Sequence, residues 1–189
     1  SDSRHMPPNF YYEQEDFLID FQNGKEWTWA VLRPEAVCGF AVGNPMNLIM
    51  CFGTYAAISK ELGMPLKYPG DLRGFEAINQ VTDSGLLARM TMWSATSPNA
   101  ANEIFNITNG DGFRYVNVWS DWAAALGMEI GMPQRIISAE VMADKGPVWD
   151  RIVEKHGLMN LSYEQTAGWP YFDFNMDTSW DVLMSDAKR

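Results

Sequence analysis

Two adjacent tyrosines, Tyr11 and Tyr12, carry the most evident chemistry in the sequence, and they lie in the polar, acidic stretch NFYYEQED at residues 9–16. A free phenol has a pKa of roughly 10, so it remains protonated at neutral pH. It can then donate a hydrogen bond to a carbonyl oxygen that gains negative charge. From the residues alone, a tyrosine pair at the start of a helix is more often a packing feature, and both interpretations stay open at this point.

The other reactive side chains give weaker patterns. Glu13, Glu15 and Asp16 suggest an acid–base cluster, but a solvated helix face is the better interpretation. The two histidines, His5 and His156, lack partners at the spacing of a metal site, and we interpret both as surface residues. No G-x-S-x-G motif is present, so a serine hydrolase has no support. We therefore expect no metal site.

The composition excludes several classes of protein. A net charge of −10 repels phosphate backbones, so we expect no nucleic-acid partner. Cys38 and Cys51 lack metal-ligand spacing and form no disulfide framework, which is typical of the reducing cytoplasm. No signal peptide opens the sequence, and no apolar run approaches the roughly 20 residues that span a bilayer. We expect a cytoplasmic chain without membrane contact.

The tyrosines must be positioned by a helix over residues 11–23, with Gly24 as its stop. A strand is expected at 27–33, and the apolar run at 36–42 predicts a strand buried on both faces. We interpret Arg33 at the strand end as paired to an acid. Further along the chain, the patterns predict helices over 46–62, 84–96 and 115–126, a strand at 103–107, and two helices within 139–156 that are separated at Gly146-Pro147.

Strands that alternate with helices predict an α/β fold. The sequence offers only two or three good sheet strands, which is too few for a complete doubly wound domain. No G-x-G-x-x-G follows a strand, so the glycine loop that binds a dinucleotide is missing from the pattern.

The block NFYYEQED resembles the NFYYxxED motif of the progesterone 5β-reductase and iridoid synthase-like reductases, a branch of the extended short-chain dehydrogenases. Four further blocks are similar to segments of that family, in its order: TWAVLRPEAVCGF, MNLIMCFGTYAAISKELGMPLKYPG, NEIFNITNGDGFRYVNVW and DKGPVWDRIVEKHGL. The resemblance covers nearly the whole chain. It implies the C-terminal part of a Rossmann-like fold, with few parallel strands and a mainly helical substrate-binding region.

The resemblance implies that Tyr11 is catalytic and that Tyr12 packs. These enzymes reduce conjugated carbonyls, and Tyr11 would hold the enolate oxygen that forms. Ordinary short-chain dehydrogenases carry a lysine four residues after the tyrosine, but here that position is Glu15. In this family the lysine comes from upstream instead.

The resemblance also implies the cofactor contacts. NADPH or NADH would be the cofactor, with Val37 at the nicotinamide through its backbone, and with Asn44, Pro45 and Met46 near the phosphates. For Val37, an ordinary strand position is nearly as good an interpretation. The residue that selects NAD over NADP lies in the family's dinucleotide-binding half, which has no counterpart in this sequence.

We therefore expect residues 1–189 to form a single partial domain, inactive by itself, that acts with a missing N-terminal half or another chain. The expected substrate is a small apolar enone, enal or aldehyde, and a homodimer is possible within the family. The Met and Trp residues at helical spacing are mostly core, and some of Met46, Met50 and Phe52 are candidates to face the substrate. Two alternatives stay open. One is a sugar-nucleotide epimerase or dehydratase of the same superfamily, and the other is a non-catalytic module that binds small molecules.

Overall fold

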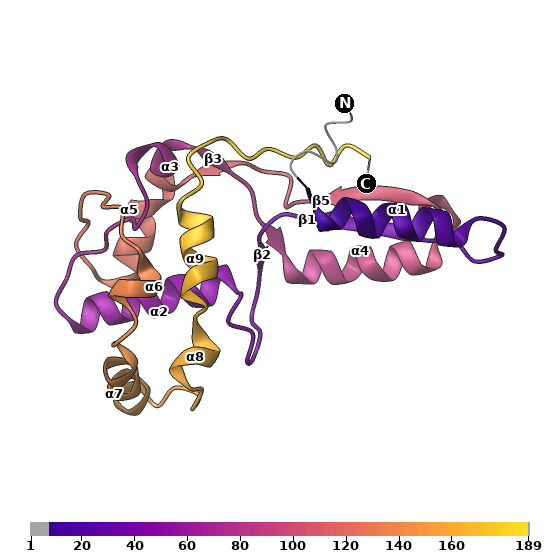
Figure 1. Cartoon of the computed structure of the whole chain (residues 1–189). Coiled ribbons are helices and arrows are strands. Elements are labelled where there is room, and N and C mark those ends of the chain that lie inside the picture. The colour runs from indigo at the N-terminus through magenta and orange to yellow at the C-terminus, as the bar shows by residue number, and fades with distance from the viewer. Residues whose placement is uncertain (1–7, 189) are drawn as a thin grey trace.

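The computed structural model describes residues 8–188, which form two regions joined by short strands (Figure 1). The sheet region contains α1 (Phe10–Gln22), β1 (Ala30–Pro34), α4 (Ser84–Thr96), the short 3-10 helix η2 (Pro98–Ala100) and β5 (Glu103–Ile107). The helical region contains α2 (Leu48–Glu61), α3 (Leu72–Glu76), α5 (Tyr115–Leu126), α6 (Ser138–Val141), α7 (Gly146–His156), α8 (Tyr163–Thr166) and α9 (Trp169–Met176).

The central pair of strands, β1 and β5, is parallel, with Leu32 opposite Phe105 and Arg33 opposite Asn106. Successive side chains of a strand point to opposite faces. Leu32 and Phe105 pack with Leu86 and other apolar side chains of α4 on one face. Arg33 and Asn106 lie on the other face, toward α1. The helices α1 and α4 therefore cover opposite faces of this strand pair, as expected for an α/β fold.

The prediction of a continuous strand at 36–42 is wrong. Only β2 (Val37–Cys38) forms, and it pairs in parallel with β4 (Thr82–Asp83). The ladder ends there because Asp83 is also the N-cap of α4, so the partner strand turns into a helix. Gly39 then passes so close to α4 that a Cβ would lie 2.0 Å from the Oγ of Ser84. Beyond it, Phe40 is 76% exposed.

The helices predicted at 11–23, 46–62, 84–96 and 115–126 are confirmed as α1, α2, α4 and α5. Their ends follow ordinary capping rules. The side chain of Asn47 accepts from the N–H of Met50 at the start of α2, and Gly127 closes α5 in the left-handed conformation. The last two strands, β3 (Ile78–Asn79) and β6 (Phe113–Arg114), pair antiparallel beside the helical region.

Replacing Asp83 with alanine is expected to lower the free energy of unfolding by about 1 kcal/mol. The Oδ1 atom of Asp83 accepts from the N–H of Leu86 at 2.8 Å, and alanine would leave that donor without its cap. Asp83→Asn is the matched control, because asparagine caps a helix nearly as well. Urea denaturation measures both variants. Equal losses for the two substitutions would contradict a capping role.

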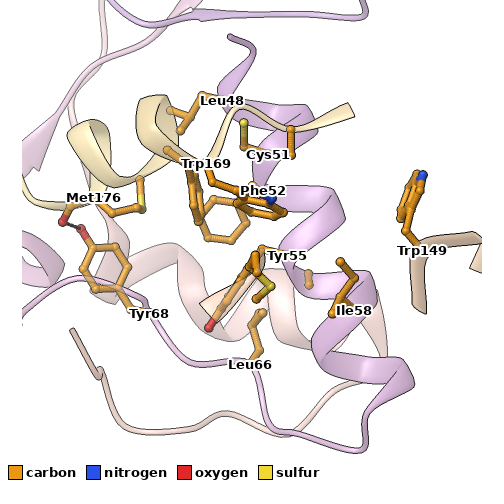
Figure 2. Packing of buried hydrophobic residues seen from close by; sticks show 14 of the residues in the cluster. Leu48, Cys51, Phe52, Tyr55, Ile58, Leu66, Tyr68, Trp149, Trp169 and Met176 are labelled. Carbon is orange, nitrogen blue, oxygen red and sulfur yellow. Dashed lines mark hydrogen bonds between the residues drawn. The ribbon is translucent and has the colours of Figure 1, made fainter. Parts of the chain in front are cut away.

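The main hydrophobic core lies in the helical region, where Figure 2 shows side chains of α2 and α9 meeting those of Leu66 and Tyr68 in the loop after α2. Phe52 of α2 and Trp119 of α5 lie at its centre, with ring centroids 5.2 Å apart. The indole N–H of Trp119 donates to the carbonyl oxygen of Leu66 at 3.1 Å. These contacts pack α2, α5 and the loop at Leu66 together in the helical region.

Candidate active site

Helix α1 places Tyr11 at the edge of the sheet region. The side chain of Asn9 accepts from the N–H of Tyr11 at 3.0 Å, so the tyrosine lies in the first turn of the helix. Its side chain is 62% exposed. Because little packing holds the ring, its place in space depends on the helix that carries it.

A cleft of about 840 Å³ opens beside this turn, between α1 and the ends of the two central strands. Its lining includes Tyr11, Tyr12, Pro34, Glu35, Asn106 and Met184. The volume lies within the range of small-molecule sites, about 300–1,000 Å³. The structure thus brings Tyr11 together with the segment that follows β1, as an active site built at the end of a strand requires.

The interpretation of Glu13, Glu15 and Asp16 as a solvated helix face is wrong for Glu15. It is the buried residue of α1, at 6% exposure, whereas Glu13 is exposed. The guanidinium of Arg33 donates to both carboxylate oxygens, with Nε 2.7 Å from Oε1 and Nη2 on Oε2. The prediction that Arg33 pairs with an acid is confirmed. Sequence reasoning missed the acid because its burial depends on the strand that α1 meets.

Tyr12 lies half-buried beneath the same arginine. The Cζ atom of Arg33 is 5.6 Å from the centroid of the Tyr12 ring, within the range of a cation–π contact. This contact is what a packing role for Tyr12 predicts. The two tyrosines therefore differ in environment: one ring is largely in solvent, and the other is covered by a guanidinium.

A second cavity of about 170 Å³ lies between the sheet region and the helical region. Its lining includes Glu35, Leu48, Gln80, Tyr115, Trp180 and Val182. Glu35 lines both this cavity and the cleft, so the two spaces share one wall. Burial raises the pKa of the Tyr115 phenol above its usual value, which keeps that hydroxyl protonated at any physiological pH.

The extended segment at 179–188 forms part of the wall of both spaces. It runs from α9 to the strands β1 and β5 (Figure 1). The N–H of Met184 donates to the side chain of the buried Gln80 at 2.6 Å, and the N–H of Val182 donates to the carbonyl of Ile78 at 2.8 Å. Val182 lines the second cavity and Met184 lines the cleft.

The predicted cofactor residues lie in and after β2. Val37 is half-buried in β2, and the side chain of Asn44 accepts from the N–H of Met46 at 3.1 Å. The carbonyl of Pro45 accepts from the N–H of Gly168 at 2.8 Å, which ties this turn to α9. Among the described residues, the lining of the cleft at Tyr11 does not include these four positions. Their role in cofactor binding remains a prediction.

The remaining reactive side chains among the described residues form no second candidate active site. Within residues 8–188, no group of three or more histidine, cysteine, aspartate or glutamate side chains is arranged to hold a metal ion. His156 is exposed at the end of α7, and His5 lies outside the described residues. Burial, and then the carboxylate of Asp83, raise the pKa of the Cys38 thiol, which disfavours a nucleophilic thiolate. None of the described helices is both long and apolar enough to cross a membrane.

Sequence reasoning placed Met46, Met50 and Phe52 as possible substrate contacts. Phe52 is instead a core residue, in contact with Trp119 and Phe172. Part of the lining of the second cavity, including Trp180 and Val182, comes from the stretch after residue 160, which has no clear periodicity. Only tertiary structure places them, since they belong to an extended segment without a regular partner strand.

Comparison with known sequences places these features in a family. Residues 4–185 match the model of the PRISE-like Rossmann-fold domain. The chain is 38% identical over 186 residues to the (S)-8-oxocitronellyl enol synthase ISY1 of Nepeta cataria, and this match covers 96% of the chain and 48% of the relative. It is 33% identical to the short chain dehydrogenase gsfE of Penicillium aethiopicum, with 98% of the chain and 54% of the relative covered. The chain thus spans about half the length of the curated relatives it matches.

Comparison with solved structures supports the fold alone. The epimerase Mth375 of Methanothermobacter thermautotrophicus aligns with a TM-score of 0.51 at 16% identity, over 89% of this chain and 51% of that one. RMD of Pseudomonas aeruginosa, solved in complex with NADPH, aligns with a TM-score of 0.50 at 13% identity, over 87% and 53%. The expected Rossmann-like α/β class is confirmed.

Proposed function

The chain belongs to the PRISE-like Rossmann-fold family, and on this premise we propose that it forms the tyrosine-bearing, substrate-binding part of an NAD(P)H-dependent reductase of conjugated carbonyls. The observation that carries the proposal is the position of Tyr11 on a cleft that shares the wall of Glu35 with a second cavity. A cofactor ring and a small carbonyl compound need two adjoining spaces of this kind, with a hydroxyl donor at their edge.

The chemistry assigned to the chain is the control of one oxygen atom. A reduced nicotinamide, when bound, would supply the hydride for the β-carbon of the enone, and the electron pair of the C=C bond would move toward the carbonyl oxygen. The Tyr11 hydroxyl donates a hydrogen bond to that oxygen as it becomes an enolate. Tyr11 is a suitable donor because it is exposed on the cleft and lies in the first turn of α1, where the helix dipole favours developing negative charge.

The proposed substrate is an apolar enone or enal. Leu48, Trp180 and Val182 give the second cavity an apolar wall, and its lining also includes the polar residues Glu35, Asn79, Gln80, Tyr115, Asn175 and Thr178. The apolar wall suits a hydrocarbon body, and the polar residues suit its carbonyl group. The names of several relatives support the same proposal. Each is called an enol synthase, and an enol is the protonated form of the enolate that Tyr11 is proposed to hold.

We further propose that the cofactor pyrophosphate is bound outside this chain, by a dinucleotide-binding half or a second chain. The glycine-rich turn that places backbone N–H groups on a pyrophosphate has no counterpart in the sequence. The outer face of α1 supports the proposal, because Phe10, Phe17 and Phe21 are each more than half exposed. A partner half that packs on α1 would remove these rings from water.

Adding NADPH to the 189-residue chain is expected to give no binding in the micromolar range, because the phosphate site is assigned to another segment. Titration with the fluorescence of the reduced nicotinamide as the signal measures this. The control is the complete protein, for which micromolar binding and oxidation of NADPH in the presence of an apolar enone are expected. Micromolar binding by the short chain would contradict the division of the site. A complete protein that binds NADPH but does not reduce any enone would contradict the proposed reaction.

A further inference from the structure

The pattern of burial on α1 is inverted for a helix that packs against a sheet. Its aromatic residues Phe10, Phe17 and Phe21 are 58%, 69% and 56% exposed, whereas the carboxylate residue Glu15 is 6% exposed. A buried carboxylate is costly unless it is paired and hydrogen-bonded. The attachment of this helix to the sheet therefore has a polar contact at its centre.

That contact has a fixed geometry. The Nε and Nη2 atoms of Arg33 each donate to one oxygen of Glu15, which is the two-point pairing that a guanidinium forms with a carboxylate. Such a pair resists rotation of either group. Arg33 itself is the penultimate residue of β1, where it lies opposite Asn106 of β5 in the parallel strand pair.

A third residue completes the arrangement. The guanidinium of Arg33 also lies over the ring of Tyr12, 5.6 Å from its centroid. One strand residue thus contacts two residues of α1, at positions 12 and 15, which lie one turn apart on the same side of the helix. Two contacts at different heights along a helix fix both its rotation about its own axis and its height above the sheet.

Tyr11 depends on this arrangement more than its neighbours do. It lies four residues before Glu15, and thus on nearly the same face. Its own side chain is 62% exposed, so local packing does not hold it in place. A change in the rotation of α1 moves the Tyr11 hydroxyl across the mouth of the cleft.

We infer that Glu15 and Arg33 are positioning residues, whose ion pair sets the rotation of α1 and so places the Tyr11 hydroxyl on the cleft. This inference rests on the reaction proposed above. In this inference Glu15, four residues after Tyr11, holds α1 in place through its ion pair with Arg33 of β1. Both residues also belong to the lining of the cleft, and the role assigned to them acts through the helix that carries Tyr11.

The test compares Arg33→Lys and Glu15→Gln in the complete protein. Lysine keeps the charge but loses the two-point geometry, and glutamine keeps the shape but loses the charge. We expect faster amide hydrogen exchange in the peptide that covers α1, a fall in kcat of about tenfold or more, and little change in KM. Arg135→Lys is the matched control. Arg135 forms a two-point pair with Asp177, at 2.8 and 2.9 Å, in the helical region, and its replacement should change neither quantity.

A double-mutant cycle separates positioning from general stability. If Arg33 acts through the Tyr11 hydroxyl, Arg33→Lys should lower kcat strongly in the native background and by less than about twofold in the Tyr11→Phe background. Equal loss in both backgrounds, or unchanged exchange in α1, would overturn the inference. Glu15→Gln must give the same pattern, which guards against an effect of the lysine alone. Absence of enone reduction in the unsubstituted protein would instead overturn the proposed function, and the inference with it.

Discussion

Tyr11→Phe is expected to lower the kcat of the complete reductase by roughly 10²-fold or more, with a smaller change in KM. The substitution removes only the hydroxyl, so the helix and its cap at Asn9 should persist. What is lost is the donor to the enolate oxygen, a contact that strengthens as negative charge develops. A contact of this kind raises kcat more than it lowers KM, because it stabilises the transition state more than the bound ketone.

The control for this prediction is Tyr12→Phe. The Tyr12 ring lies under Arg33, and that contact needs the ring rather than its hydroxyl, so kcat should change little. Steady-state kinetics on a poorly activated enone gives the most sensitive comparison, because its enolate oxygen needs the most stabilisation. The opposite order of effects would mean that Tyr12 is the donor. Near-native activity of both variants would exclude a chemical role for the NFYYEQED block.

Trp119→Ala is expected to lower the free energy of unfolding by about 3–5 kcal/mol. Trp119 is 1% exposed, and its ring contacts Phe52, Tyr68 and Phe75 in the helical region. Alanine would leave a cavity at the centre of this cluster. It would also remove one of the two N–H donors to the carbonyl of Leu66, which would keep only the N–H of Gly131.

Trp180→Ala is the matched control for this loss. It removes the same ring from a side chain that is 65% exposed, so the expected change in stability is within about 0.5 kcal/mol. Urea unfolding followed by circular dichroism measures both variants. A similar loss for the two tryptophans would mean that the aromatic cluster does not determine the stability of the helical region.

The sequence predicted the elements that are specified locally. Asn9, Asp83 and Gly127 mark ends of α1, α4 and α5, and each works through hydrogen bonds or backbone conformation within a few residues. The apolar run at 103–107 predicted β5 for the same reason, since a short run between turns is typical of a buried strand. Such signals need no knowledge of the rest of the fold.

The features that the sequence did not reveal depend on contacts across the chain. The run at 36–42 was predicted as one strand, but the ladder ends after Cys38 because its partner turns into α4. Glu15 was interpreted as solvated, because its neighbours are polar and Arg33 lies on another element. The walls of the cavities come from Glu35, Tyr115 and Trp180, and no spacing in the sequence connects these three.

The parallel pair of β1 and β5 has a consequence for the order of folding. Residues 30–34 of β1 pair with residues 103–107 of β5, so a long loop must close before the two strands meet. This contact is therefore expected to form more slowly than the local turns of the helices. The cleft at Tyr11 needs this pair and also Met184, close to the other end of the sequence. During synthesis on the ribosome, α1 can therefore coil early, while the pocket that it serves closes only once residue 184 has emerged.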